Sequence, residues 1–205
     1  MSGMDLSSYI TIIVSTVFIN NLILSRFLGL CPFIGVSKHT GPAVSMGIAV
    51  TFVTTMASII TWLLYKFVLL PYDLQYLRTL SFILVIAAFV QFAEIIIQKK
   101  SPALYKMLGI YLALITTNCA VFGVAILNTD MFFLNNKAVA GSFYMSVLQG
   151  FGAGLGFTLA MFLMSGIRER LEFADVPKCF KDAPITFVIA SLMSLAFLGF
   201  SGFKV

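Results

Sequence analysis

The sequence predicts an all-α membrane protein in which six transmembrane helices form two inverted three-helix repeats, with spans one and four broken at the midplane. Three observations predict this fold: the composition, the spacing of the charge-free runs, and a short motif present in each half of the chain. The 205 residues are 60% hydrophobic and 10% charged, and the mean hydropathy is +1.03. Soluble domains carry roughly 25% charged residues, so the chain is expected to be integral to a membrane.

Six runs contain no Asp, Glu, Lys, Arg or His: residues 6–25, 40–65, 79–93, 107–129, 138–167 and 183–203. A helix needs about 20 apolar residues to cross a hydrocarbon core of ~30 Å. Five runs reach this range directly, and the third reaches it when it continues past Glu94 to Ile97. We therefore expect one integral membrane domain over residues 1–205, with repeat one at about 6–98 and repeat two at about 107–203.

Basic residues are divided unequally between the two sides of these predicted spans. Loops one, three and five carry nine of the 13 Lys and Arg residues, Arg26 among them, and the other side carries four. The positive-inside rule places the richer side in the cytoplasm, so both termini are expected to face outward. Four aromatic residues near the predicted outer interface would form an aromatic belt: Trp62, Tyr65, Tyr72 and Tyr76.

The repeated motif is Cys-x-x-x-Gly-Val. It begins at Cys31 in the first half and at Cys119 in the second. Three spans per copy would make the second copy enter the membrane from the opposite side, which is the arrangement of an inverted repeat. A second match lies in spans two and five, where Gly47, Thr55 and Ala57 share their spacing with Gly150, Thr158 and Ala160.

Both cysteine segments contain residues that interrupt helices. Pro32 lacks a backbone donor and disfavours helical backbone at Cys31, and the Thr116-Thr117-Asn118 segment competes for backbone hydrogen bonds just before Cys119. Irregular backbone at membrane depth persists only where protein or a cavity covers it. Broken spans in matching positions of two halves indicate a binding site near the midplane.

The two cysteines have several possible roles. Each could simply pack as a small hydrophobe, and a disulfide between them is geometrically possible. Ligation of zinc or an iron–sulfur cluster usually needs four ligands, so two thiolates would form half of a site completed by a second, similar subunit. Cys179 follows Pro177 in a charged loop and is interpreted as incidental, and His39 as an interfacial residue.

Polar residues in the broken spans either line a cavity or cap half-helices, and we expect five of them near an ion path: Asn20, Asn21, Thr116, Thr117 and Asn118. The alternating charges of residues 168–172, from Arg168 to Glu172, are most simply a solvated helix end, with a docking surface as the other interpretation. Nucleic-acid binding is not indicated, because the net charge of +5 forms no basic stripe. The sequence also contains no P-loop, no catalytic triad, no flavin-attachment motif and no basic segment typical of a cleavable signal peptide.

Several segments resemble those of a known family. They are Asn20-Asn21, residues 27–33 with Gly35-Val36-Ser37, residues 114–121, residues 167–171, residues 174–177 and residues 194–197. Together they closely resemble the A subunits of the Rnf complex, the ion-translocating ferredoxin:NAD oxidoreductase, and more distantly the E subunits of the sodium-pumping NADH:quinone reductase. Ala113 departs from this pattern, because the family has proline there.

The resemblance implies a multi-pass protein of the bacterial inner membrane, and the outward-facing termini expected from the charges would then be periplasmic. It implies a [2Fe-2S] cluster shared with the paralogous E subunit of Rnf, in which Cys31 and Cys119 are this chain's two ligands. Further partners would be membrane flavin subunits, cytoplasmic iron–sulfur and NAD-binding subunits, and Na⁺ or H⁺. The chain would then be one component of a translocase, without a complete active site of its own. The alternative is a protein resembling a secondary ion transporter, in which the cysteines are structural.

Overall fold

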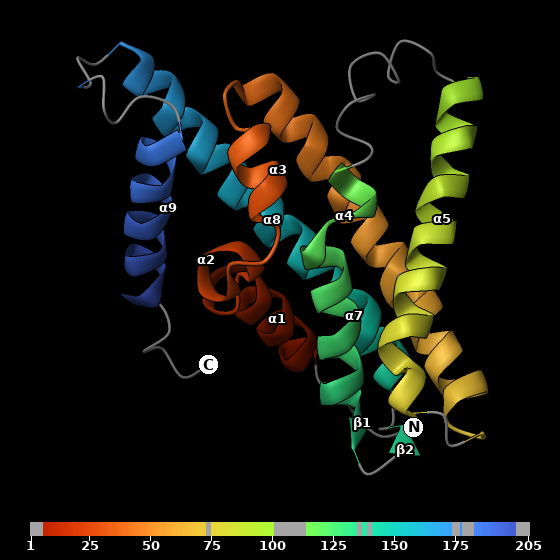
Figure 1. Cartoon of the computed structure of the whole chain (residues 1–205). Helices are drawn as coiled ribbons and strands as arrows, with labels where there is room; N and C mark the ends of the chain where they lie inside the picture. Colours follow the sequence, from red (N-terminus) through yellow and green to blue (C-terminus); the bar gives the residue numbers. More distant parts are fainter. Residues whose placement is uncertain are drawn as a thin grey trace.

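The computed structural model describes residues 6–72, 75–100, 114–134, 137–138, 141–173, 177 and 183–199. These residues form helices and one short antiparallel ladder (Figure 1). The first half contains α1 (Leu6–Val14), a π-helical turn (Ser15–Ile19), α2 (Leu22–Arg26), α3 (Leu30–Gly35), α4 (Thr40–Leu64), a second π-helical turn (Tyr65–Leu69), a 3₁₀ turn (Gln75–Leu77) and α5 (Arg78–Lys100). The second half contains α7 (Cys119–Phe132), β1 (Phe133–Leu134), β2 (Lys137–Ala138), α8 (Ser142–Glu172) and α9 (Ala183–Leu198).

The described helices agree in position with the six charge-free runs. Three are long and apolar enough to cross a membrane: Thr40–Leu69, Leu114–Phe132 and Ser142–Glu172. Three shorter apolar helices lie within or beside the other runs: Ile10–Ile19, Arg78–Phe92 and Ala183–Leu198. The helical class is therefore confirmed, and the arrangement as six spans stays a prediction.

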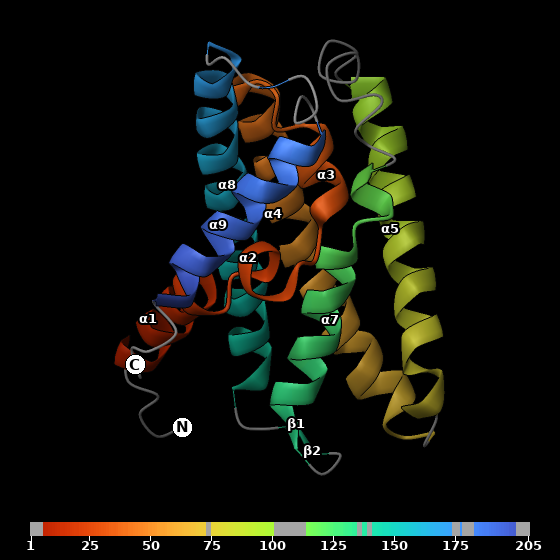
Figure 2. The same ribbon diagram turned by 60° about the vertical axis from the view of Figure 1, so that its left-hand side comes forward.

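The centre of the molecule is a crossed pair of helices, α4 and α8, which run in opposite directions (Figures 1 and 2). Glycines allow the two backbones to approach closely at the crossing. A Cβ at Gly47 would lie 2.7 Å from Thr158 Cγ2, and a Cβ at Gly154 would lie 2.5 Å from Thr51 Cα. Small residues in helix contacts of this kind are typical of membrane proteins.

The contact between α4 and α8 is reciprocal. Gly47 faces Thr158 while Gly154 faces Thr51, and the two threonine hydroxyls are hydrogen-bonded to each other at 3.1 Å. When a glycine of each helix faces a threonine of the other, the contact has the pattern expected of two elements related by a two-fold axis. This contact pairs Gly47 with Gly154, whereas the sequence spacing paired Gly47 with Gly150, one helical turn earlier in α8.

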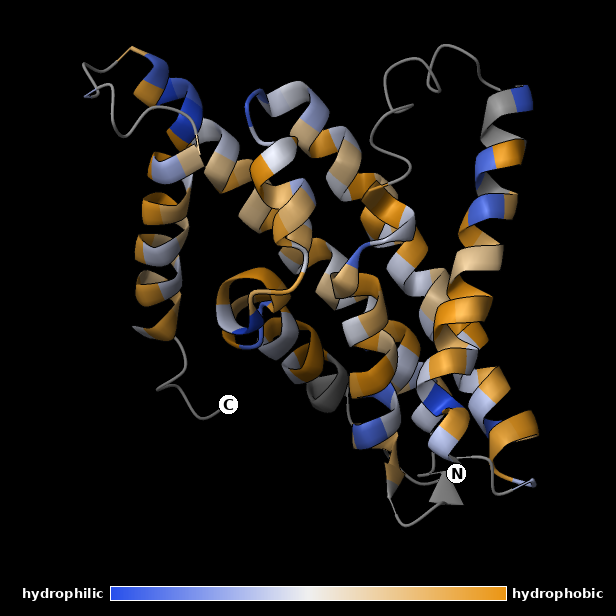
Figure 3. Cartoon of the chain, viewed as in Figure 1, coloured by the Kyte–Doolittle hydropathy of each residue, from blue (hydrophilic) through white to orange (hydrophobic). Residues whose placement is uncertain are grey.

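The other helices surround this pair. α1 and its π-helical continuation pack on α8, α9 packs against α2, and α5 lies beside α4 and α7. Apolar residues cover most of α5 and α9, and hydrophilic residues gather at the ends of α5 and α8 (Figure 3). Leu80 and Leu84 on α5 and Leu192 and Leu195 on α9 are exposed. These outer faces are suited to lipid or to other apolar subunits rather than to water.

The expected aromatic belt is only partly correct. Trp62 and Tyr65 are buried, and Trp62 Nε1 donates a hydrogen bond to Ser142 Oγ at 2.7 Å. The Trp62 ring also packs edge-on against Phe143, with centroids 5.0 Å apart. A buried indole needs such a hydrogen-bond acceptor, and the start of α8 supplies it. Tyr72 and Tyr76 are exposed, as a belt position would require.

The crossing of α4 and α8 makes a direct prediction about stability. Gly154→Ala should destabilise the protein by about 1–3 kcal/mol, because the new methyl group meets the α4 backbone rather than a movable side chain. Gly166→Ala in the same helix is the matched control, since nothing lies within 4 Å of its Cβ position, and it should be neutral or stabilising by up to about 1 kcal/mol. Thermal unfolding of the purified variants measures both. Equal unfolding temperatures for the two variants would contradict the observed packing.

Candidate metal-binding site

The first interruption of the chain lies at Asn20 and Asn21, where the π-helical turn ends. Asn21 has extended backbone (φ −62°, ψ 119°) and its side chain accepts a hydrogen bond from Ile23 N at 3.2 Å, which caps the N-terminus of α2. Its amide Nδ2 donates to Val17 O at 3.1 Å and to Gly156 O at 2.9 Å. Asn21 is 1% exposed, so this buried amide replaces backbone hydrogen bonds that the interruption removes.

A second interruption follows at residues 27–29. Phe27 and Gly29 both have left-handed backbone, with φ of 55° and 83°, and α3 begins at Leu30. The break predicted near Cys31 therefore lies just before it, and Pro32 falls in the first turn of α3. Proline is tolerated there because the N–H that it lacks would have no partner within the helix.

The interruption of span four lies at residues 117–118, directly before α7. Asn118 has extended backbone (φ −72°, ψ 111°), and its Oδ1 accepts a hydrogen bond from Ala120 N at 3.0 Å. Cys119 is the first residue of the helix that follows. The local geometry is the same as at Asn21: an asparagine ends one segment and caps the next.

The interruptions meet at the middle of the molecule. Gly29 N donates a hydrogen bond to Cys119 Sγ at 3.4 Å, although the two residues are 90 positions apart. A Cβ at Gly29 would lie 3.0 Å from Asn118 Oδ1 and 3.0 Å from Phe157 Cε2, so only glycine fits. Phe157 is halfway along α8, and its neighbour Gly156 accepts the hydrogen bond from Asn21.

Cys31 and Cys119 are consequently brought to the same region, on the first turns of two helices that start side by side. Both thiols are free, and both residues are exposed. Within the described residues no three His, Cys, Asp or Glu side chains gather where they could hold a metal ion. The arrangement leaves two exposed thiols near the adjoining starts of α3 and α7. Cys179 lies outside the described residues.

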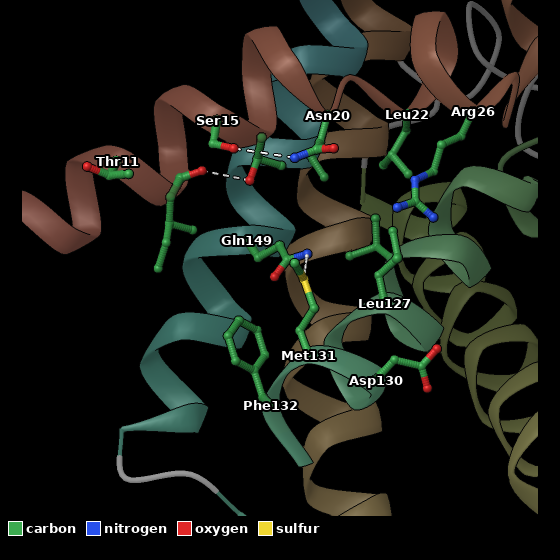
Figure 4. Close-up of a pocket in the computed structure, with 14 residues that line it drawn as sticks. Thr11, Ser15, Asn20, Leu22, Arg26, Leu127, Asp130, Met131, Phe132 and Gln149 are labelled. Atoms are coloured by element: carbon green, nitrogen blue, oxygen red, sulfur yellow. Dashed lines mark hydrogen bonds between the residues drawn. The ribbon is translucent and has the colours of Figure 1, made fainter. Parts of the chain in front are cut away.

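The polar residues of the broken spans separate into two environments. Asn21 and Asn118 are buried, and Nδ2 of Asn118 has no hydrogen-bond partner among the described residues. Thr116 is half-buried and Thr117 is exposed. Asn20 is exposed and lines a cavity of about 420 Å³ between the π-helical turn, α2, α7 and α8 (Figure 4).

Sequence reasoning did not assign the two charged residues that line this cavity, Arg26 and Asp130, or the amide of Gln149 to a site. Arg26 was assigned to the first cytoplasmic loop, but it lies in α2, between the two interruptions. Without Arg26, the predicted cytoplasmic loops carry eight Lys and Arg residues and the other side carries four, so the predicted orientation is unchanged. Asp130 forms an ion pair with Arg78 of α5 at 2.7 Å.

Comparison with known proteins identifies the family of this chain. Residues 9–204 match the family described as "Rnf-Nqr subunit, membrane protein". The chain belongs to the Rnf-Nqr family. The match also confirms that its helices are those of a membrane protein, and it spans all three described interruptions together with Cys31 and Cys119.

Curated relatives within the Rnf-Nqr family are similar along almost their whole length. The proteins named as the A subunits of the ion-translocating oxidoreductase complex from Azoarcus sp. and Photorhabdus laumondii are 54% and 55% identical to the chain over 197 residues. The alignments cover 96% of this chain and 98% of each relative. The same-named protein of Proteus mirabilis is 54% identical over the same lengths.

The two neighbouring asparagines should differ sharply in their effect on stability. Asn21→Ala removes the cap of α2 and the hydrogen bond to α8, and we expect a loss of about 2–3 kcal/mol. Asn20→Ala should cost little, because its described contact is a single exposed hydrogen bond to Ser15 Oγ at 3.3 Å. Thermal unfolding of the two variants compares them. A larger loss for Asn20→Ala would refute the roles assigned here.

Proposed function

We propose that this chain is the A subunit of an Rnf-type ion-translocating oxidoreductase and holds half of a [2Fe-2S] cluster. The observation that carries the proposal is the meeting of two interrupted spans, each presenting a free thiol, in a chain that resembles A subunits over 96% of its length. The remaining two ligands would come from the paralogous E subunit of the same complex.

The residues at the site fit such a cluster. Cluster-binding thiolates accept hydrogen bonds from backbone N–H groups, and these bonds help to set the reduction potential. Gly29 N already donates to Cys119 Sγ, and Asn118 Nδ2 is a buried donor beside it without a described partner. The start of the 14-residue helix α7 places the positive end of a helix dipole at Cys119. When bound, the cluster would supply a one-electron carrier.

The finer architecture is part of the same proposal. Six spans would form two inverted repeats in the bacterial inner membrane, with both termini periplasmic. The reciprocal Gly47–Thr158 and Gly154–Thr51 contacts support the repeat, and the excess of basic residues in loops one, three and five supports the orientation. Electrons would pass between ferredoxin and NAD through the cytoplasmic and membrane flavin subunits of the complex.

Ion movement is proposed to use the cavity beside Asn20. Val124, five residues beyond Cys119, lines this cavity together with Arg26 and Asp130. At an effective dielectric constant of ~20, the interaction energy of two unit charges ~10 Å apart is about 2 kcal/mol. Negative charge added at the cysteine sulfurs would therefore favour a cation, Na⁺ or H⁺, in this cavity. Asn21 and Asn118 would act on that path by holding the half-helices in place.

Replacing either candidate ligand should remove the cluster. In the purified complex, Cys31→Ser and Cys119→Ser should each abolish the electron paramagnetic resonance signal of the reduced [2Fe-2S] centre and lower the iron and acid-labile sulfide content. Cys179→Ser is the matched control and should retain both. A full signal in Cys119→Ser would contradict the shared site and favour the alternative, in which the cysteines only pack and the chain resembles a secondary ion transporter.

A variant of the cavity should uncouple ion movement from electron flow. Asn20→Leu makes the cavity wall more apolar without removing a helix cap, so the ratio of ions moved to electrons transferred should fall while electron flow continues. Leu127→Met, a volume-conserving change in the same wall, is the control and should leave the ratio unchanged. Vesicles containing the complex allow both fluxes to be measured together. An unchanged ratio in Asn20→Leu would place the ion path elsewhere.

A further inference from the structure

Two neighbouring residues near the end of α8 hold the loop that connects α3 to α4. Arg168 donates hydrogen bonds from the same nitrogen, Nη1, to Ile34 O and to Ser37 Oγ, both at 2.8 Å. Glu169 Oε1 accepts hydrogen bonds from Thr40 N and Thr40 Oγ1, both at 2.9 Å. The expectation of a simple solvated helix end is therefore wrong for these two residues.

Each charge matches the helix end that it contacts. Ile34 is in the last turn of α3, where carbonyl groups lack partners within the helix and a positive charge is favourable. Thr40 is the first residue of α4, whose N-cap residue His39 makes no side-chain cap, and a negative charge is favourable there. Arg168 and Glu169 thus cap two consecutive helices from a third.

These caps matter because α3 is too short to be stable alone. It has six residues, and isolated helices shorter than about 12 residues are marginal in water. One end of α3 is fixed by Gly29, which packs against Asn118 and Phe157. The other end is fixed by Arg168. Cys31 lies between these two anchors, so its position depends on both.

We propose that Arg168 and Glu169 are positioning residues for Cys31. Arg168 holds α3 at the end opposite to Gly29, Glu169 holds the start of α4 at the other end of the α3–α4 loop, and together they fix the geometry of the thiol as a ligand. This inference rests on the proposed function, in which Cys31 binds iron. In this proposal the end of α8 sets the position of the α3–α4 loop and, through α3, that of Cys31. Cys119 is positioned separately, by the Asn118 cap at the start of α7.

The test uses the purified complex carrying Arg168→Leu, with Arg170→Leu as the matched control because Arg170 is exposed on the same helix end. Hydrogen–deuterium exchange should become several-fold faster within residues 30–40 of Arg168→Leu and stay unchanged within residues 119–125. The line shape and midpoint potential of the cluster signal should shift in the same variant. Arg168→Lys, which keeps the charge, should recover both readouts in part. Arg170→Leu should match the wild type.

Exchanging the two charges is a stricter version of the test. Arg168→Glu combined with Glu169→Arg places the wrong charge at both helix ends and should accelerate exchange at residues 30–40 more than Arg168→Leu does. If Arg168→Leu does not assemble, Ser37→Ala removes one of the two acceptors and should give a smaller shift in the same direction.

Two results would overturn the inference. Unchanged exchange at residues 30–40 in Arg168→Leu would show that α3 does not need the hydrogen bonds from Arg168. Faster exchange with an unchanged line shape and midpoint potential of the cluster signal would show that the hydrogen bonds from Arg168 stabilise α3 but do not position Cys31. Absence of a cluster in the wild-type complex would instead refute the proposed function and with it the role for Cys31, a result distinct from both.

Discussion

The contact between Gly29 and the Asn118–Cys119 segment is the constraint on which the rest of the structure depends. It joins the interruptions of two spans that are 90 residues apart, through the hydrogen bond from Gly29 N to Cys119 Sγ. The side of Gly29 that lacks a Cβ packs against Asn118 and Phe157. This approach brings the start of α3, which carries Cys31, to the start of α7, which carries Cys119, and the proposed shared site depends on it.

Breaking a helix inside a membrane protein leaves backbone groups that need hydrogen-bond partners. The structure meets this need with an asparagine at each of two interruptions: Asn21 caps α2 and also reaches Gly156 on α8, and Asn118 caps α7. Arg168 and Glu169 provide equivalent hydrogen bonds at the α3–α4 connection. The interrupted segments are therefore held by specific polar contacts, and the long helix α8 takes part in several of them.

Much of this arrangement could be predicted from the sequence, and the reasons differ from residue to residue. The charge-free runs predicted where the helices lie, since hydrophobic length is a strong signal. Pro32 and Thr116-Thr117-Asn118 predicted the interruptions near Cys31 and Cys119, because these residue types disturb helices locally. The first break was nevertheless more complex than expected: α2 lies between two interruptions, so Arg26 is in a helix and lines a cavity.

Features that depend on contacts between distant segments could not be predicted. The sequence spacing matched Gly47 to Gly150, whereas the helix contact pairs it with Gly154, one turn further along α8. This pairing follows from how α4 and α8 cross, and the spacing of residues along the chain does not contain that information. Trp62 is buried and hydrogen-bonded to Ser142, although its position suggested an interfacial residue. Arg168 and Glu169 have an ordinary charge pattern, and only the fold shows which helix ends they meet.

The most direct measurement is an electron cryomicroscopy map of the assembled complex at a resolution that shows individual sulfur ligands. We predict density for an iron–sulfur cluster in contact with Cys31 and Cys119 of this chain and with two cysteines of one neighbouring, similar protein of the complex. Two free thiols with no density between them, or a disulfide joining Cys31 to Cys119, would contradict the shared site.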